Sequence, residues 1–400
     1  MAQTPVGQAG EPSMDDILAS IRKILNEDDQ APVAGAPPTE SAVADATEGH
    51  DLGNLRLRCA RRPHEGDVVS RSTPSLAMSL PITGVDGREA VALARAATDE
   101  GYTAVWASEV QGPDAFTLLG ALAVTTDLEL GVAVVPAQTR TAFVLGMSAV
   151  SLAELSAGRF TLGIGSSSEL IVQRWAGQPF DRPLTAVRET VDALRPVLAG
   201  ERSTLDGEVV SLGGYSPHAA PPGGRVPLVV AALNPRSCRA VGELHVDGVC
   251  LNQLAPHHVP QVLEQVATGA GGSLPDDYRV IARLFCAVTD DVPATREAVK
   301  ATFAPYIMAE AYNRFYRWMG YEEAADGVLA ARGDRKAMAA AISDELVDDL
   351  FCLGTAEQVA AKIAAYCDAG VTTPVVHPIA MGREQAEATL WPLVRAWNAA

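Results

Sequence analysis

The sequence predicts an α/β fold, a (β/α)8 TIM barrel with a disordered N-terminal tail that carries one short amphipathic helix. From residue 76 onward, short apolar runs alternate with segments of helical periodicity, and such alternation indicates a parallel sheet. We count eight of these units over about 325 residues, a length that suits a closed barrel with insertions. An open doubly wound sheet is the alternative, because alternation does not by itself show that the sheet closes.

The first four predicted strands are short and apolar, and helical spacing follows each of them. These strands cover residues 75–81, 102–109, 128–136 and 159–165. Helices follow at 87–101, 113–126 and 141–158, with Gly101 as a C-cap and Pro113 near the first helical position. After the fourth strand come helices around 170–176 and 183–199, and then a hairpin insertion around Asp206-Gly207.

The second half continues the same alternation. The remaining strands cover residues 226–233, 246–254, 278–289 and 373–380. Helices are predicted at 235–244, 257–268, 294–318 and 355–370, and a further helix closes the chain near Trp397. A helical excursion fills the region 320–350 and provides a candidate wall for a substrate pocket.

The chain changes composition near residue 75. The segment DDQAPVAGAPPTESAVADATEGHDLG is rich in Ala, Pro and acidic residues and has almost no large apolar side chains. Such a segment cannot bury enough surface to offset its ordering entropy. We therefore predict a disordered tail over residues 1–75 and one barrel domain over residues 76–400.

Residues 13–27 are the exception within this tail. Apolar residues recur at helical spacing from Met14 to Leu25, and Ser13 is a plausible N-cap. This segment resembles the N-terminal client-binding helix of the bacterial polar organising protein PopZ, which implies a docking peptide for a protein partner. The alternatives are a helix that packs on its own barrel, and an accident of gene fusion or start-site choice.

Composition excludes several classes of function. The formal net charge of −18 argues against nucleic acid or an anionic membrane as the main partner, since both require a basic surface. The six cysteines have no CxxC spacing, which indicates neither a zinc site nor a redox pair and suits the cytoplasm. No apolar run reaches the roughly 18 residues that span a bilayer. The pair His257-His258 has no second ligand cluster nearby, so no metal site is predicted.

The end of the fourth strand is the first candidate site. The strand stops in small residues, and in a barrel of this type the chemistry lies at the carboxyl ends of the strands. Backbone N–H groups and hydroxyls at such a turn suit a phosphate, although Gly-Ser turns after strands are common. The residues concerned are Gly163, Gly165, Ser166 and Ser167.

Several segments together resemble the luciferase-like flavin and deazaflavin oxidoreductases. The segments are SAGRFTLGIG, RWAGQPFDRPLTAVRETVDALRPVLAGE, VPLVVAALNPRSCRAVGELHVDGVCLN and DDLFCLGTAEQVAAKIAAYCDAGVTTPVV. The branch that uses coenzyme F-420, a 5-deazaflavin hydride carrier, resembles this chain best. The resemblance runs in order from about residue 76 to 395 and implies that the flavin-like ring lies across the strand ends, with its phosphate near the loops after the middle strands.

The resemblance also implies roles for residues after the second and third strands. In VWASEV, Glu109 matches an acidic residue beside the ring, but Val110 stands where relatives have His. Asp114 is a second carboxylate near this rim, or else a helix cap. A non-prolyl cis peptide that supports the deazaflavin is expected at Ala133–Val134, against the alternative of an ordinary trans strand.

Loops after the later strands supply the remaining cofactor candidates. Gly163, Gly165, Ser166 and Ser167 match the phosphate-side loop. Leu233 and Asn234 replace glycines in a loop that donates backbone N–H groups in relatives. Asn252 is a polar contact to the ligand or a turn residue, and Trp175 is a substrate platform or a core residue.

Two polar side chains stand within the last two strands. Arg283 in IARLF is costly to bury unless an anion pairs with it, so it is a candidate for the substrate or for an acidic coenzyme tail. His377 in VVHPIA is a candidate general acid or base, with a satisfied core histidine as the alternative.

The function expected from these residues is hydride transfer between F-420 and a small organic substrate. The first alternative is a monooxygenase that uses reduced FMN and oxygen. The second is a localised interaction protein that docks through residues 13–27. A homodimer is expected from the family, while the sequence does not identify the substrate.

Overall fold

The computed structural model describes residues 74–110 and 112–400. Chain contacts divide the protein into Met1–Val68 and Val69–Ala400, and all the described residues belong to the second unit. The expected tail and the helix at 13–27 lie outside the described residues. Among the described helices, none is both long and apolar enough to cross a membrane.

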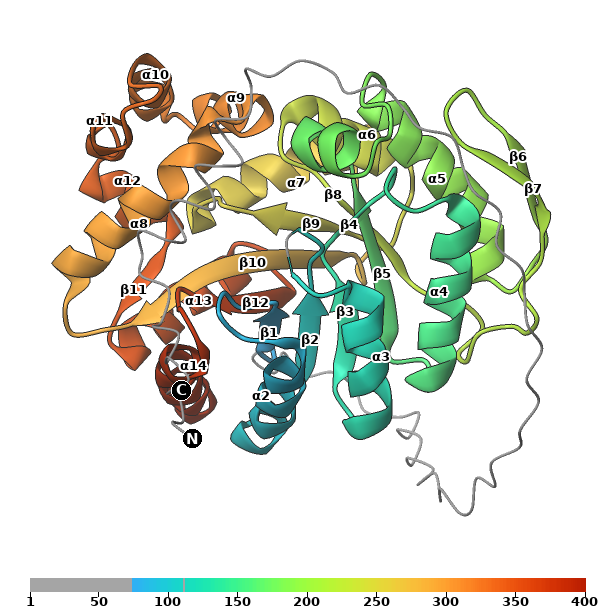
Figure 1. The fold of residues 1–400 in the computed structure, drawn as a ribbon, viewed down its shortest axis with the longest axis horizontal. Coiled ribbons are helices and arrows are strands. Elements are labelled where there is room, and N and C mark those ends of the chain that lie inside the picture. The colour runs from blue at the N-terminus through green and yellow to red at the C-terminus, as the bar shows by residue number, and fades with distance from the viewer. Residues whose placement is uncertain (1–73, 111) are drawn as a thin grey trace, which may run out of the picture. The chain divides into compact units, whose positions relative to one another are not determined.

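Eight parallel strands close into a ring at the centre of this unit (Figure 1). In chain order they are β1 (Ala77–Leu80), β2 (Ala104–Ala107), β3 (Glu129–Val132), β5 (Phe160–Gly165), β8 (Leu228–Ala231), β9 (Gly248–Asn252), β10 (Arg279–Val288) and β12 (Thr373–Pro378). The first strand pairs with both β2 and β12, and β10 pairs with both β9 and β12. This closure confirms the predicted barrel and excludes the open doubly wound sheet.

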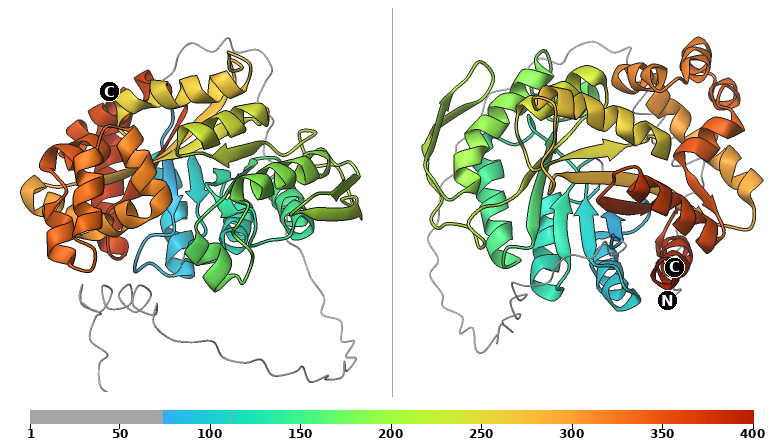
Figure 2. Two further views of the ribbon diagram at one scale, coloured as in Figure 1. Left: turned by 90° about the horizontal axis from the view of Figure 1, so that it is seen from above. Right: turned by 180° about the vertical axis from the view of Figure 1, so that it is seen from behind.

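Helices surround the barrel and cover its outer face (Figure 2). They are α2 (Gly87–Glu100), α3 (Ala115–Thr125), α4 (Ala142–Leu155), α5 (Pro183–Leu198), α6 (Pro235–Glu243), α7 (Val259–Gly269), α8 (Val292–Met308), α13 (Ala356–Asp368) and α14 (Arg383–Ala399). The last of these packs beside α2, which joins the two ends of the described chain. The main core lies between these helices and the strands.

Shorter elements extend this plan. A six-residue π-helix (Leu170–Trp175) follows β5, and a 3-10 turn (Pro256–His258) precedes α7. Strands β4 (Val135–Pro136) and β11 (Cys352–Gly354) add to the rim of the barrel on β5 and β10. The predicted hairpin is present as β6 (Ser203–Asp206) and β7 (Ser211–Tyr215), and it projects at one edge of Figure 1. The predicted excursion is helical: α10 (Glu322–Ala330), α11 (Arg335–Ala340) and α12 (Asp344–Leu350).

Two helix predictions need correction. The helix predicted at 294–318 is two helices, α8 and α9 (Glu310–Trp318), because Ala309 between them is extended (φ −67°, ψ 128°). The buried Asn313 side chain donates to the Ile307 carbonyl at the end of α8 and so satisfies it. The helix predicted from Pro113 begins at Ala115 instead, because Asp114 is its N-cap and accepts a hydrogen bond from the Thr117 N–H (2.7 Å).

The interior of the barrel is filled by a layer of mostly small side chains. Trp106 is its largest member, and it is surrounded by Ala77, Ala104, Val229, Cys250, Ile281 and Val375. A Cβ atom on Gly131 would lie 2.4 Å from Trp106 Cε3. A glycine is therefore required beside the indole. The next layer of side chains, toward the carboxyl ends of the strands, contains the polar groups.

Candidate active site at the barrel mouth

Four neighbouring strands carry inward-facing polar side chains at their carboxyl ends. Side chains alternate along a strand, so Arg283 follows the interior residue Ile281 on the inner face of β10. The strand register sets Arg283 level with Asn252 on β9. In the same way, His377 follows Val375 on β12 and Ser79 follows Ala77 on β1. The structure therefore brings Arg283, His377 and Asn252 to one wall of the barrel mouth, where in this fold the ligand binds.

His377 is held as a neutral imidazole in this wall. Its Nδ1 lies 3.1 Å from the Ser79 hydroxyl oxygen, and Arg283 Nη2 lies 3.0 Å from Nδ1 and 3.1 Å from Nε2. Burial, together with the charge of Arg283, lowers the pKa of His377 well below its ordinary value. This state suits a group that accepts a hydrogen bond, because burial and the neighbouring guanidinium both disfavour a protonated imidazole.

Asn252 and Arg283 each keep a buried polar atom without a partner. Asn252 Nδ2 donates to the Tyr312 hydroxyl at 2.9 Å, so its side chain reaches α9 and does not form a local turn. Asn252 Oδ1 and Arg283 Nε are buried, and neither has a hydrogen-bond partner in the described part of the chain. Buried polar atoms are normally satisfied, so these two indicate a place for a ligand or for water.

The opposite wall of the mouth consists of small side chains from β3, β5 and β8. A Cβ atom on Gly163 would lie 1.9 Å from the Val132 carbonyl oxygen, and one on Gly165 would lie 2.9 Å from Val134 Cγ2. Contact with the backbone and side chains of the neighbouring segment accounts for both glycines, and their expected place beside a phosphate stays a prediction. The Ala133–Val134 peptide is cis, as expected from the resemblance.

Ser166 and Ser167 lie directly after this wall and match the expected position of a phosphate loop. Ser167 has a left-handed backbone (φ 59°), and neither hydroxyl bonds to another described residue. The loop leads into the π-helix that ends at Trp175, whose side chain is 43% exposed. Trp175 is therefore not a core residue, and its role as a substrate platform stays a prediction.

The loop after β8 does not offer the free donors that were expected of it. Ser237 Oγ accepts hydrogen bonds from the backbone N–H groups of Leu233 (3.1 Å) and Asn234 (3.0 Å). The Asn234 side chain in turn accepts from the Ser237 N–H and caps α6. These two N–H groups are consumed by the capping of the helix, so they are not available to a ligand.

Glu109 and Asp114 share one cation at the rim. Arg140 Nη2 lies 2.5 Å from Glu109 Oε1, and Arg140 also pairs with Asp114. Burial alone would raise the pKa of Asp114, but hydrogen bonds from Thr117 and from Arg140 outweigh it and lower that pKa. Glu109 also accepts from the Ala115 N–H at the start of α3 (3.2 Å). Both carboxylates are therefore structural partners of Arg140 in this state.

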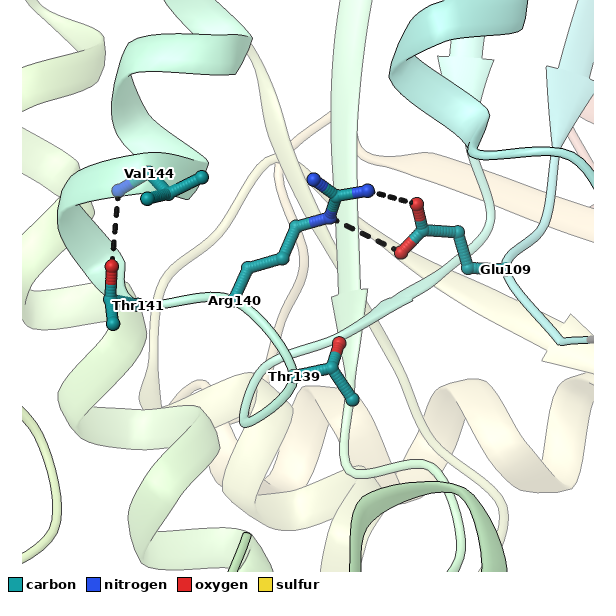
Figure 3. Close-up of a pocket in the computed structure, with 5 residues that line it drawn as sticks. All are labelled: Glu109, Thr139, Arg140, Thr141 and Val144. Atoms are coloured by element: carbon teal, nitrogen blue, oxygen red, sulfur yellow. Dashed lines mark hydrogen bonds and ion pairs between the residues drawn. The ribbon is translucent and has the colours of Figure 1, made fainter. Parts of the chain in front are cut away.

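This rim borders a surface pocket of about 450 Å³, which Figure 3 shows in close-up. Its lining joins the loop after β2 to the loop before α4, and it consists of Glu109, Thr139, Arg140, Thr141 and Val144. Thr141 caps α4 through the Val144 N–H (3.3 Å). The described residues contain no group of three His, Cys, Asp or Glu side chains that could hold a metal ion.

Sequence reasoning missed three residues of the site: Ser79, Arg140 and Tyr312. For Ser79 a signal existed, because it is a polar residue on the inward face of an apolar strand. For Arg140 and Tyr312 no local pattern exists, since their hydrogen-bond partners lie 26 to 60 positions away in the sequence.

Comparison with known proteins agrees with this architecture. A model of the family described as luciferase-like monooxygenase matches residues 70–373. The 5,10-methylenetetrahydromethanopterin reductase of Methanolobus tindarius is 30% identical over 302 residues, which are 73% of this chain and 91% of that protein. An F-420-dependent glucose-6-phosphate dehydrogenase of Mycolicibacterium gilvum is 26% identical over 317 residues, 74% of this chain and 90% of that protein.

A solved structure supports the same fold. The coenzyme F-420-dependent tetrahydromethanopterin reductase of Methanopyrus kandleri superposes with a TM-score of 0.69 at 21% identity, over 82% of this chain and 99% of that one. Because the family model spans most of the described unit and the barrel closes as the family requires, this chain belongs to the luciferase-like monooxygenase family.

Proposed function

We propose that this protein is an oxidoreductase that uses coenzyme F-420 to transfer hydride to or from a small organic substrate. The names of the curated relatives support the coenzyme. The observation that carries the proposal is the division of the barrel mouth into a wall of small residues and a wall of buried polar atoms that lack partners.

The residues present fit a flat redox group with a phosphate. The small wall of Val134, Gly165 and Ala231 would face the ring. The hydroxyls of Ser166 and Ser167, which bond to no other described residue, would meet the phosphate. A bound deazaflavin supplies a two-electron hydride acceptor or donor. The chain itself would hold the substrate against the polar wall and keep bulk water away from it.

Within that wall, His377 is the side chain suited to bind a substrate hydroxyl. Burial and the charge of Arg283 keep its imidazole neutral, and the Ser79 hydroxyl beside Nδ1 orients the ring. Its unprotonated ring nitrogen would accept a hydrogen bond from a substrate hydroxyl and so orient the neighbouring carbon, between which and the coenzyme the hydride would pass. Glu109 pairs with Arg140 and would thereby hold the loop after β2 against the loop before α4.

Titration of the purified protein with reduced F-420 and with reduced FMN tests the proposal. We expect changes in the absorbance of the F-420 ring at micromolar protein concentrations and no substrate-dependent uptake of oxygen. The second candidate function is a monooxygenase that uses reduced FMN, and it is supported by the description of the family as luciferase-like monooxygenase. Tight FMN binding with substrate-dependent oxygen uptake would establish that candidate and refute F-420 as the coenzyme.

A further inference from the structure

Arg283 is a cation inside the barrel that faces no carboxylate among the described residues. Its contacts are the His377 ring at 3.0 Å and the Phe285 ring, whose centroid lies 4.9 Å from Arg283 Cζ. Neither contact supplies negative charge, because His377 is neutral and the Phe285 ring offers only its quadrupole. A buried charge without a counter-ion is costly, so this arrangement is complete only when an anion is present.

The other arginine on the inner face of β10 is different. Arg279, four residues earlier on the same face of the strand, donates to the Thr161 hydroxyl at 2.7 Å and lies within electrostatic reach of Asp247. Arg279 thus has its polar partners within the chain. The contrast between Arg279 and Arg283 on one strand indicates that the cation at the mouth is kept for an external group.

Hydroxyl donors meet the guanidinium at the same place. Tyr312 accepts a hydrogen bond from Asn252, so its own O–H hydrogen is free to donate to a further acceptor. Tyr306 is 43% exposed, and its ring lies 5.9 Å from that of Tyr312. Both phenols lie within electrostatic reach of Arg283. The group that completes this set is therefore an acceptor with negative charge.

Aromatic rings pack beside these donors, and Tyr306 is the exposed ring among them. Tyr306 stacks on Phe303 at 5.3 Å, and Phe303 packs edge-on against Phe285 at 4.8 Å. A flat apolar body next to the charged group would find dispersion contacts here. A carboxylate suits the planar guanidinium better than a tetrahedral anion does, because two oxygens in one plane match the fork of an arginine.

We propose that the substrate of this enzyme is a carboxylic acid with a flat unsaturated or aromatic body, whose carboxylate binds to Arg283 and Tyr312. The inference rests on the proposed function, because it assigns a substrate class to the same barrel mouth. A carboxylate of the coenzyme is the other source of such a group. We favour the substrate because Arg283 stands inside the barrel, beside His377 and one layer above Ile281, and not on the outer loops.

Isothermal titration of the full chain with benzoate and with its neutral isostere benzamide tests the anion site. We expect the wild-type protein to bind benzoate roughly ten to a hundred times more tightly than benzamide, the range for a hydrogen bond to a charged group. Arg283→Gln should abolish that preference, and Tyr312→Phe should reduce it several-fold. Arg279→Gln, a matched loss of charge on the same strand, should leave it intact. Circular dichroism and melting curves identify any variant that fails to fold, and Tyr312→Phe then carries the test.

Titration of the same variants with reduced F-420 separates the two sources. Arg283→Gln should leave F-420 affinity within about twofold of the wild type, since its charge serves the substrate. Loss of F-420 affinity in Arg283→Gln, or wild-type protein that does not distinguish benzoate from benzamide, would overturn the inference. If the benzoate preference is present but F-420 does not bind, the coenzyme assignment fails while the anion site stands.

Discussion

Replacing Gly163 by alanine should destabilise the barrel, although the change adds only one methyl group. The new Cβ atom would lie 1.9 Å from the Val132 carbonyl oxygen and 3.3 Å from Val229 Cγ2. The carbonyl belongs to the backbone of the neighbouring strand, so it cannot rotate away as a flexible side chain would. Relief requires β3 and β5 to separate by roughly 1 Å in an interior that is close-packed.

We expect the free energy of unfolding of Gly163→Ala to fall by about 2–3 kcal/mol, the usual cost of overpacking a core. Urea denaturation followed by tryptophan fluorescence measures this change. The separation also moves Val132 and the small wall of the mouth, so F-420 affinity should fall as well.

Gly120→Ala is the matched control for this experiment. Gly120 lies within α3, and a Cβ atom there would meet nothing within 4 Å. The same methyl group should therefore stabilise the protein by up to about 1 kcal/mol through helix propensity. If both variants shift the urea midpoint in the same direction, or if Gly163→Ala leaves it unchanged, the argument from strand contact is wrong.

Three further predictions concern charge and the tail. Burial, with a smaller effect from the charge of His257, lowers the pKa of His258 to about 4. Between about pH 6.5 and pH 4 the unfolded chain therefore binds a proton on this histidine that the folded chain does not bind. The contribution of His258 to the free energy of unfolding should be full above about pH 6.5 and fall by up to about 3 kcal/mol toward pH 4. Urea titrations across this range should show that His258→Asn removes that part of the slope. Arg140→Ala should cost about 1 kcal/mol and weaken F-420 binding, since Glu109 loses its partner, and Arg140→Lys should restore only part of either quantity. Deletion of residues 1–30 should leave turnover unchanged while it abolishes the capture of any protein partner in a pull-down.

Local pattern was sufficient to predict the barrel but not its mouth. Each strand and most helices follow from apolar periodicity within a few residues, and Gly101 and the hairpin at Asp206-Gly207 follow from turn chemistry. The break at Ala309 was missed because no Gly or Pro marks it. It depends on Asn313, whose side chain donates both to the Ile307 carbonyl at the end of α8 and to the Ala325 carbonyl in α10, a contact that local pattern does not reveal.

The contacts that build the site are almost all distant in sequence. Ser79 and His377 stand 298 positions apart, and Asn252 and Tyr312 stand 60 apart. Arg283 and His377 were selected because polar residues are rare in buried strands. Their partners could not be predicted in this way, because a contact across the barrel depends on strand register and on closure of the sheet, and not on neighbouring residues.

Closure of the ring therefore does more than stabilise the sheet. Ser79 and His377 belong to the first and last strands, which meet only because β1 pairs with β12; in an open sheet with these strands at its two edges, this pair would not form. Closure also sets the polar wall from β9, β10, β12 and β1 opposite the small wall from β3, β5 and β8. In our proposal, a substrate bound to Arg283 on one wall faces, across the mouth, the wall of small residues where we expect the hydride carrier to lie. We expect the placement of these two walls on opposite sides of the mouth to determine the orientation of substrate and coenzyme, more than the identity of any one side chain does.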